Sequence, residues 1–226
     1  MTLLNRKAVE SKEEAENEKV SVRRKNETSN GNYHVPWKRA QLSLRLITII
    51  IGSTAILSNS IYGLFAPKYL GFKQAQLSST YSTAAILMVL SQVCFPTFVS
   101  RIGEFGTCTC GILLAGAGIT GMSVVRFQPF HTMLYMVQRT GASVADTATA
   151  SLVARESRGE ERSRNLAMLT STRAAARIVS PLACSKLFEI SSRSTRHPGA
   201  LPFLIIGGLA ILISPLPRLI KVKSRK

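Results

Sequence analysis

Four charged residues lie well away from the ends of two long stretches of small and apolar residues in the second half of the chain. Arg139 and Asp146 lie in the stretch 131–153, and Arg173 and Arg177 lie in the stretch 166–190. Each stretch is long enough for a helix to cross a bilayer, where an ionisable side chain costs about 2.5–3.5 kcal/mol on insertion scales. Such side chains normally pair with one another or line a wet cavity. We therefore expect them to form a salt bridge, bind a polar solute or carry a proton.

The register of the two stretches predicts that Asp146 pairs with Arg173. In a helix that rises about 1.5 Å per residue, each lies on the order of 11 Å from the same end of its stretch. Two roles remain open for Asp146, because it could be a structural ion-pair partner or the proton-coupling group of a transporter. Arg139 and Arg177 then lack an acid in these stretches. They could meet acids of another part of the assembly or bind an anionic substrate.

Six apolar stretches of about twenty residues predict an all-α membrane protein with one six-helix transmembrane domain over residues 42–218. The stretches are residues 45–66, 79–99, 107–125, 131–153, 166–190 and 200–216. Short polar segments separate them, among them the predicted loops 67–78 (with Pro67 ending the first helix), 100–106 and 154–165. Residues 1–41 are polar and highly charged, which is typical of a disordered cytosolic tail or linker, and residues 219–226 form a basic tail.

The distribution of basic residues predicts that both termini are cytosolic. If both ends are inside, the segments that flank the stretches on the inner side carry 13 basic residues, counted from Lys38 to Lys226, and the outer loops carry 5. This distribution follows the positive-inside rule. The formal net charge of +17 does not indicate nucleic-acid binding, because the charge lies in the tails and in alternate loops. The four cysteines lack the spacing of a zinc site, so we expect no metal and no cofactor.

Two further sets of residues are of types that act in helix packing or in polar contacts within a membrane. The third stretch contains Gly111, Gly116, Gly118 and Gly121, which predict close packing of helix backbones. The outer half of the first stretch is polar and contains Asn59, Ser60 and Tyr62. These side chains could hydrogen-bond to a neighbouring helix or face a substrate path, and the sequence favours neither.

Three motifs resemble those of a known family. They are Ser100-Arg101-Ile102-Gly103 between the second and third stretches, the loop with Arg158, Gly159 and Arg162, and the segment with Arg177, Ser180, Pro181 and Leu182. With the charged segment before the first stretch, they resemble the C-terminal six-helix half of a major facilitator superfamily transporter, in the drug:proton-antiporter, tetracycline-efflux-like branch. The resemblance covers about 180 residues. It departs from the family pattern at Ser100, at Glu104-Phe105 and at Ser180.

The resemblance implies transport of a small solute across a lipid bilayer by alternating access, with protons as a possible coupling ion. It implies substrate- or proton-pathway roles for residues of the first, fourth and fifth stretches, namely Asn59, Ser60, Tyr62, Gln138, Arg139, Asp146, Arg173 and Arg177. It implies gating roles for Arg101, Gly103, Arg158, Gly159 and Arg162. Because the family has two such halves around one cavity, an N-terminal half or a second copy is expected to complete the cavity.

A different class of function remains open beside transport. A six-helix membrane protein could be a non-transporting scaffold, or a regulatory half-transporter that pairs with another subunit. An enzyme is not expected, because the stretches contain no HExxH, Gly-Asp or His–Asp–Ser pattern. The residue pattern indicates an integral, multi-pass protein, and it identifies neither the substrate nor the membrane.

Overall fold

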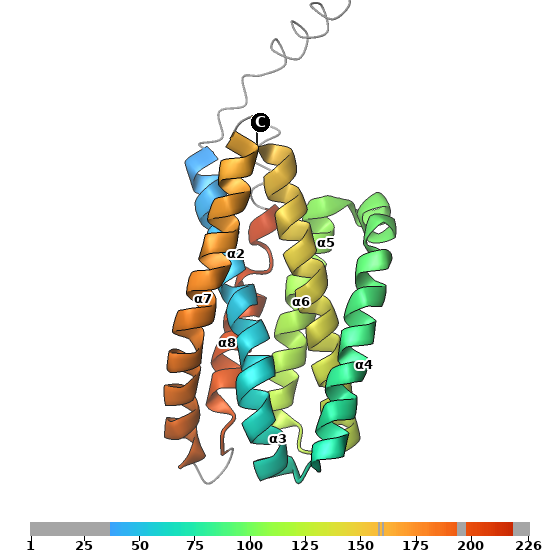
Figure 1. The fold of residues 1–226 in the computed structure, drawn as a ribbon, viewed down its shortest axis with the longest axis vertical. Helices are drawn as coiled ribbons and strands as arrows, with labels where there is room; N and C mark the ends of the chain where they lie inside the picture. The colour runs from blue at the N-terminus through green and yellow to red at the C-terminus, as the bar shows by residue number, and fades with distance from the viewer. Residues whose placement is uncertain (1–36, 158, 160, 194–197, 219–226) are drawn as a thin grey trace, which may run out of the picture.

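The computed structural model describes residues 37–157, 159, 161–193 and 198–218, and the regular secondary structure in these ranges is helical throughout (Figure 1). The elements in chain order are α2 (Trp37–Ile56), the π-helix η1 (Leu57–Ile61), α3 (Tyr62–Leu70), α4 (Gln74–Val93), α5 (Phe95–Val124), α6 (Gln128–Glu156), α7 (Glu161–Ser192) and α8 (Leu201–Ile213). The first predicted stretch thus corresponds to α2, η1 and α3 in direct succession. Of the predicted tails 1–41 and 219–226, residues 1–36 and 219–226 lie outside the described residues, and residues 37–41 belong to α2 rather than to a tail.

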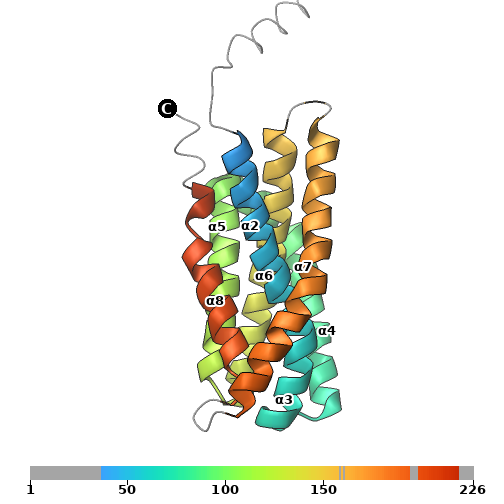
Figure 2. The same cartoon turned by 90° about the vertical axis from the view of Figure 1, so that its left-hand side faces the viewer.

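The helices run along the long axis of an elongated bundle. In Figure 1, α7 and α4 lie at the two edges of the near face, with α2–α3 and α6 between them. Figure 2 shows α5 and α8 on the opposite side of the bundle from α4 and α7. The face formed by α7, α2–α3, α6 and α4 is therefore covered by no other described helix, and we call it the open face.

Glycines bring α5 and α6 into backbone contact. A Cβ atom added at Gly141 would lie 2.6 Å from the backbone nitrogen of Ala115, and one added at Gly111 would lie 2.7 Å from that of Ala145. Gly116 meets α8 in the same way, because its Cβ would lie 3.0 Å from the backbone nitrogen of Ile211. Real Cβ atoms do not approach backbone this closely, so only glycine fits. The predicted packing role of the glycines is confirmed.

The core has an aromatic half and an aliphatic half. Near α3, the rings of Tyr62 and Tyr135 stack with centroids 4.4 Å apart, and Phe65 packs on Phe203 at 5.0 Å. At the other end of the bundle, aliphatic and small side chains of α2, α5, α6, α7 and α8 form the second half of the core (Leu44, Ile47, Ile51, Ile112, Ala148, Leu152, Leu169 and Ile213). Both halves bury their side chains between the open face and the α5–α8 side.

The first helix does not end at Pro67, as predicted, but continues to Leu70. Proline removes one backbone donor and clashes with the turn before it, yet Pro67 lies inside α3. The helix ends at Gly71, whose left-handed conformation (φ 69°) stops the helical hydrogen bonding. The expected loop 67–78 is reduced to a short connection before α4.

The predicted loop 100–106 is also helical. α4 ends at Val93, and Pro96 lies in the first turn of α5, where a proline is well tolerated. α5 then runs through the predicted loop and is interrupted at Gly103, which has φ 73° and ψ 166°. The sequence therefore located the break in the helix correctly, but a single glycine with positive φ forms it in place of a longer loop.

The connection between α6 and α7 is shorter than the predicted loop 154–165. α6 extends to Glu156 and α7 begins at Glu161. Charged residues at both ends had made the segment look like a loop. Such residues are compatible with helical turns that project beyond the apolar stretch.

Within the described ranges, three helical stretches are long and apolar enough to cross a membrane by length and composition, namely Gln41–Leu70, Phe95–Val124 and Leu201–Arg218. Large apolar side chains also face outward on helices on different sides of the bundle. Val93 on α4 and Ile178 on α7 are each 72% exposed, and Leu212 on α8 is 75% exposed. Water does not favour such a surface, whereas lipid does, so the surface indicates an integral membrane protein.

Candidate functional site

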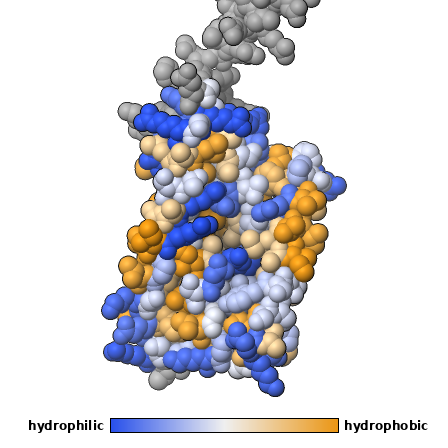
Figure 3. Space-filling view, in the orientation of Figure 1, coloured by the Kyte–Doolittle hydropathy of each residue, from blue (hydrophilic) through white to orange (hydrophobic). Residues whose placement is uncertain are grey.

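Polar and charged residues gather in the middle of the open face. Figure 3 shows hydrophilic surface there, with hydrophobic surface towards both edges of the face. Asn59, Ser60 and Arg177 are exposed, and Asp146 and Arg173 are half-buried. The structure therefore brings residues of α2–α3, α6 and α7 onto the same side of the bundle, as the sequence pattern predicted.

An ion pair joins α6 and α7 on this face. The Nη2 atom of Arg173 lies 2.6 Å from Oδ1 of Asp146, and the same nitrogen donates a hydrogen bond of 3.1 Å to the backbone carbonyl oxygen of Asp146. The side chain of Asp146 is 44% exposed and that of Arg173 is 23% exposed. The short distance confirms the predicted pairing of Asp146 with Arg173. Because the carboxylate is still accessible from the open face, the geometry leaves both roles of Asp146 open.

The other two arginines have different surroundings. Arg177 is exposed and lies near enough to Asp146 for electrostatic interaction. Arg139 is half-buried one helical turn from Tyr135. Among the described residues, neither arginine has an acidic side chain within ion-pair distance.

A buried hydrogen bond ties the start of η1 to α6. The side chain of Gln138 is fully buried, and the hydroxyl of Ser58 donates to its Oε1 at 2.6 Å. Ser58 also lies 2.8 Å from the carbonyl oxygen of Thr54, which competes for the same hydroxyl hydrogen. Gln138 is therefore placed behind the open face, where it links two of its helices.

Tyr62 occupies the aromatic half of the core and is not exposed on the open face. Its side chain is fully buried, and its ring stacks on Tyr135 and on His131. Asn59 and Ser60 are exposed, although only two or three residues separate them from Tyr62. Helical periodicity accounts for this change of environment, because residues two positions apart, such as Ser60 and Tyr62, lie on nearly opposite faces of a helix.

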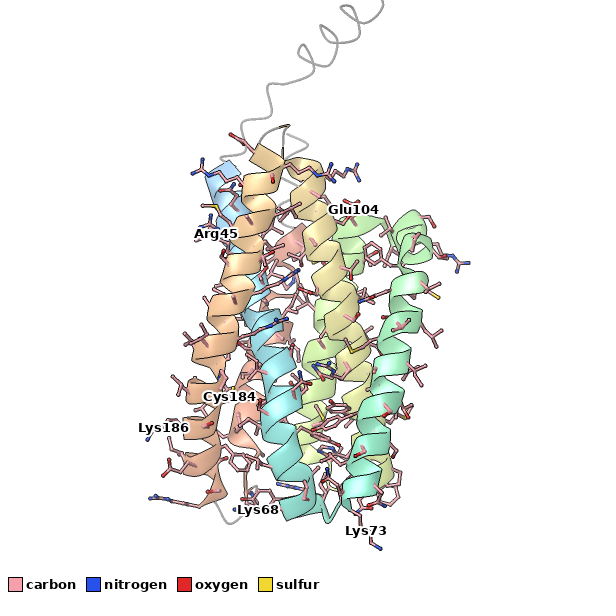
Figure 4. The ribbon with its side chains drawn as sticks, in the orientation of Figure 1. Arg45, Lys68, Lys73, Glu104, Cys184 and Lys186 are labelled. Carbon is pink, nitrogen blue, oxygen red and sulfur yellow. The ribbon has the colours of Figure 1, made fainter. Side chains whose placement is uncertain are left out.

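A pair of charges at the far end of the bundle from α3 was not anticipated from the sequence. Glu104 follows the bend at Gly103, accepts a hydrogen bond of 3.0 Å from Ser151 and lies 3.4 Å from Arg155. Figure 4 shows Glu104 at the same end of the bundle as Arg45. Glu104 had been noted only as a departure from the family motif. The spacing of Ser151 and Arg155, four residues apart on one helix, is the signal that could have indicated their common target.

The predicted gating residues are placed as follows. Arg101 is exposed, and Gly103 forms the bend in α5. Gly159 has φ 35° in the connection between α6 and α7. Arg162 is exposed on the first turn of α7 rather than in a loop, and Arg158 lies outside the described residues.

Ser180, which is a departure from the family pattern, hydrogen-bonds to α2. Its side chain is buried, and its hydroxyl lies 2.7 Å from the hydroxyl of Ser53. Ser53 donates to the backbone carbonyl oxygen of Ile49 at 2.9 Å, which leaves Ser180 as the donor between the two hydroxyls. A glycine at this position could not form that bond.

No group of three histidine, cysteine, aspartate or glutamate side chains in the described part of the chain is arranged to hold a metal ion. The site consists of an accessible ion pair, two further arginines and a set of polar side chains between apolar surfaces.

A helical bundle with an outward apolar surface and charges across the middle of one face defines a membrane protein that handles polar solutes. The family model of the Major Facilitator Superfamily matches residues 4–226, and the chain belongs to this family. Its members are membrane transporters of small solutes and not enzymes. The match extends beyond the about 180 residues of the resemblance and includes most of the charged segment 1–41. A comparison with curated proteins gave no match.

Proposed function

We propose that this chain forms the C-terminal half, or a half-size member, of a Major Facilitator Superfamily transporter that moves a small solute by alternating access. The observation that carries the proposal is the open face with its accessible Asp146–Arg173 ion pair. Charges held at mid-helix between apolar surfaces normally mark a solute or ion pathway. In this family the substrate site lies between two such halves, near the middle of the bilayer.

The proposal includes six membrane spans, although only three stretches satisfy length and composition alone. α4, α6 and α7 border the open face and carry its serines, threonines and charges, which lowers their apolar character. A helix that lines an aqueous cavity needs an apolar surface on its lipid side only. With both termini in the cytosol, the end of the bundle near Glu104 faces inward and the end near Lys68 and Lys73 faces outward (Figure 4).

A second half is part of the proposal, because the open face forms one wall of a cavity. Asn59, Ser60 and Arg177 are exposed on it, and an N-terminal half or a second copy would face them. Proton coupling through Asp146 and membership of the drug:proton-antiporter branch belong to the same proposal. The branch is supported by the Arg177–Leu182 motif and by the loop with Gly159 and Arg162.

The test is reconstitution of the full chain in proteoliposomes, alone and together with a candidate second half. The assay measures uptake of a panel of small anionic and cationic solutes and, with an internal dye, the movement of protons. We expect no flux from the chain alone and saturable flux from the paired assembly. On a blot of native membranes, an antibody to the C-terminus should detect a band near twice 24.6 kDa if the two halves form one chain.

The results separate the alternatives. Saturable uptake by a demonstrated monomer would refute the need for a second half. A stable assembly of native size that transports none of the solutes would refute transport and favour the scaffold or regulatory role.

A further inference from the structure

Arg139 is a cation whose described surroundings provide hydroxyl groups rather than an acid. It is half-buried on α6, one helical turn after Tyr135, and it lies close enough to Tyr81 of α4 for electrostatic interaction. Tyr81 belongs to α4 and Tyr135 to α6, and their ring centroids are 5.6 Å apart. Arg139 therefore lies beside a group of hydroxyls that spans two helices.

Tyr62 of α3 adds a third hydroxyl to this group. Its ring centroid lies 4.4 Å from that of Tyr135 and 6.2 Å from that of Tyr81. We call Tyr62, Tyr81, Tyr135 and Arg139 the Arg139 cluster. It draws side chains from three separate helices of the open face.

Two polar groups of the cluster have no hydrogen-bond partner among the described residues. The hydroxyl oxygens of Tyr62 and Tyr81 are both buried and unpaired, and Tyr62 as a whole is fully buried. Leaving a buried polar group unpaired is unfavourable, because its lost hydrogen bonds to water are not replaced. Such a cost is tolerated where a bound molecule supplies the missing partner.

The charge balance of the open face favours a negative molecule. Asp146 is already engaged by Arg173 at 2.6 Å, so it does not neutralise Arg139. A guanidinium together with phenol donors matches the oxygens of a carboxylate or a phosphate, which accept several hydrogen bonds at once. An uncharged ligand would leave the charge of Arg139 without compensation.

We propose that the Arg139 cluster binds the negatively charged group of an anionic substrate, a carboxylate or a phosphate. This inference rests on the proposed transport function and names the substrate class of the same open face. Arg139 pairs with the anion, and the hydroxyls of Tyr81 and Tyr62 donate to its oxygens.

The test measures binding to the full chain in lipid nanodiscs, so it does not depend on flux. Benzoate and inorganic phosphate are titrated as probes, with benzamide as the uncharged match of benzoate and with ionic strength held constant. The unfolding temperature and the fitted affinity are recorded. We expect at least one of the anions to bind and raise the unfolding temperature, and benzamide to have no effect.

Single substitutions test whether the anion binds at the Arg139 cluster. Arg139→Gln should weaken the affinity by at least about tenfold, because hydrogen bonds to a charged group typically contribute this much or more. Tyr81→Phe removes one oxygen atom while keeping the ring, and it should weaken binding several-fold. Tyr69→Phe and Arg193→Gln make the same chemical changes outside the cluster and should bind as the wild type does.

Several results would overturn the proposal. They are the absence of binding by both anions, equal effects of benzamide and benzoate, and wild-type affinity in both Arg139→Gln and Tyr81→Phe. If Arg139→Gln does not fold, Tyr81→Phe against Tyr69→Phe decides the question alone. Anion binding without flux in the paired assembly would leave this inference standing and refute transport. Flux of cations alone, without anion binding, would refute this inference and leave the proposed transport function standing.

Discussion

Replacing the two members of the Asp146–Arg173 pair, singly and together, tests the ion pair that joins α6 and α7. Asp146→Asn removes the negative charge and keeps the shape of the side chain. Arg173→Gln removes the positive charge and shortens the donor. The double variant places two neutral amides at the same positions, and these can still hydrogen-bond to each other.

The structure sets the size of the expected effect. Losing one partner of a fully buried pair costs about 3–5 kcal/mol, whereas exposed pairs contribute about 0–1 kcal/mol. The side chains here are 44% and 23% exposed, which lies between these cases. Arg173 also keeps its 3.1 Å bond to the backbone carbonyl of residue 146 in the Asp146→Asn variant. We therefore expect each single substitution to lower the free energy of unfolding by about 1–2 kcal/mol.

The assay combines a double-mutant cycle with flux. Unfolding is followed in nanodiscs for the wild type, both single variants and the double variant, and the coupling free energy should be about 1–2 kcal/mol. A coupling below about 0.5 kcal/mol, which is the usual error of additivity, would refute a structural role for the pair. If Asp146 is instead the proton carrier, Asp146→Asn should fold normally yet abolish pH-driven flux in the complete transporter. The double variant would then not restore that flux. Normal folding and normal flux in all variants would contradict both roles.

The remaining predictions concern topology and packing. In a background without the four native cysteines, an impermeant thiol reagent applied to intact cells should label a cysteine at Gln74 and spare one at Ser163 until the cells are permeabilised; the opposite pattern would reverse the orientation. Gly141→Ala should lower the unfolding free energy by about 1–3 kcal/mol, because its Cβ would lie 2.6 Å from a backbone nitrogen of α5. Gly208→Ala is the matched control, since its Cβ would meet nothing within 4 Å, and equal losses in the two variants would contradict the packing argument. Ser180→Ala should cost about 1 kcal/mol through its lost hydrogen bond to α2, and an unchanged melting curve would show that the bond contributes nothing.

The membrane-like helices and the pairing of Asp146 with Arg173 could be predicted from the sequence, because both depend on spacing along a regular helix. Apolar stretches have the length of a span, and two charges at equal depth on neighbouring helices meet if the connection is short. The role of the glycines followed in the same way, since Gly111 and Gly118 act through their lack of a side chain.

The ends and irregularities of the helices could not be predicted in this way, because they depend on single backbone conformations. Pro67 and the segment around Gly103 both carry the residues typical of a loop, yet tertiary packing keeps the helix through the first and allows one bend at the second. The contact of Glu104 with Ser151 and Arg155 could not be predicted, because it depends on the bend of α5 lying beside the end of α6. No local sequence pattern contains that information. Tyr62 was a pathway candidate only through the family resemblance, and its burial against Tyr135 and His131 depends on tertiary packing that no local pattern contains.

The π-helix η1 makes the position of a deletion in the α2–α3 segment as important as the identity of the residue removed. A π-turn closes over one residue more than an α-turn, and each residue advances a helix by about 100°. Removing a single residue between Leu57 and Ile61 would restore α-helical hydrogen bonding and keep the residues beyond it in nearly the same orientation, because the π-turn absorbs that residue. Removing one residue from the regular part of α2 would instead rotate everything beyond it by about that angle. Tyr62 and Phe65 would then leave their partners Tyr135 and Phe203, while the exposed polar side chains would turn elsewhere. Such a deletion would change no residue of the aromatic core and would still take that core apart.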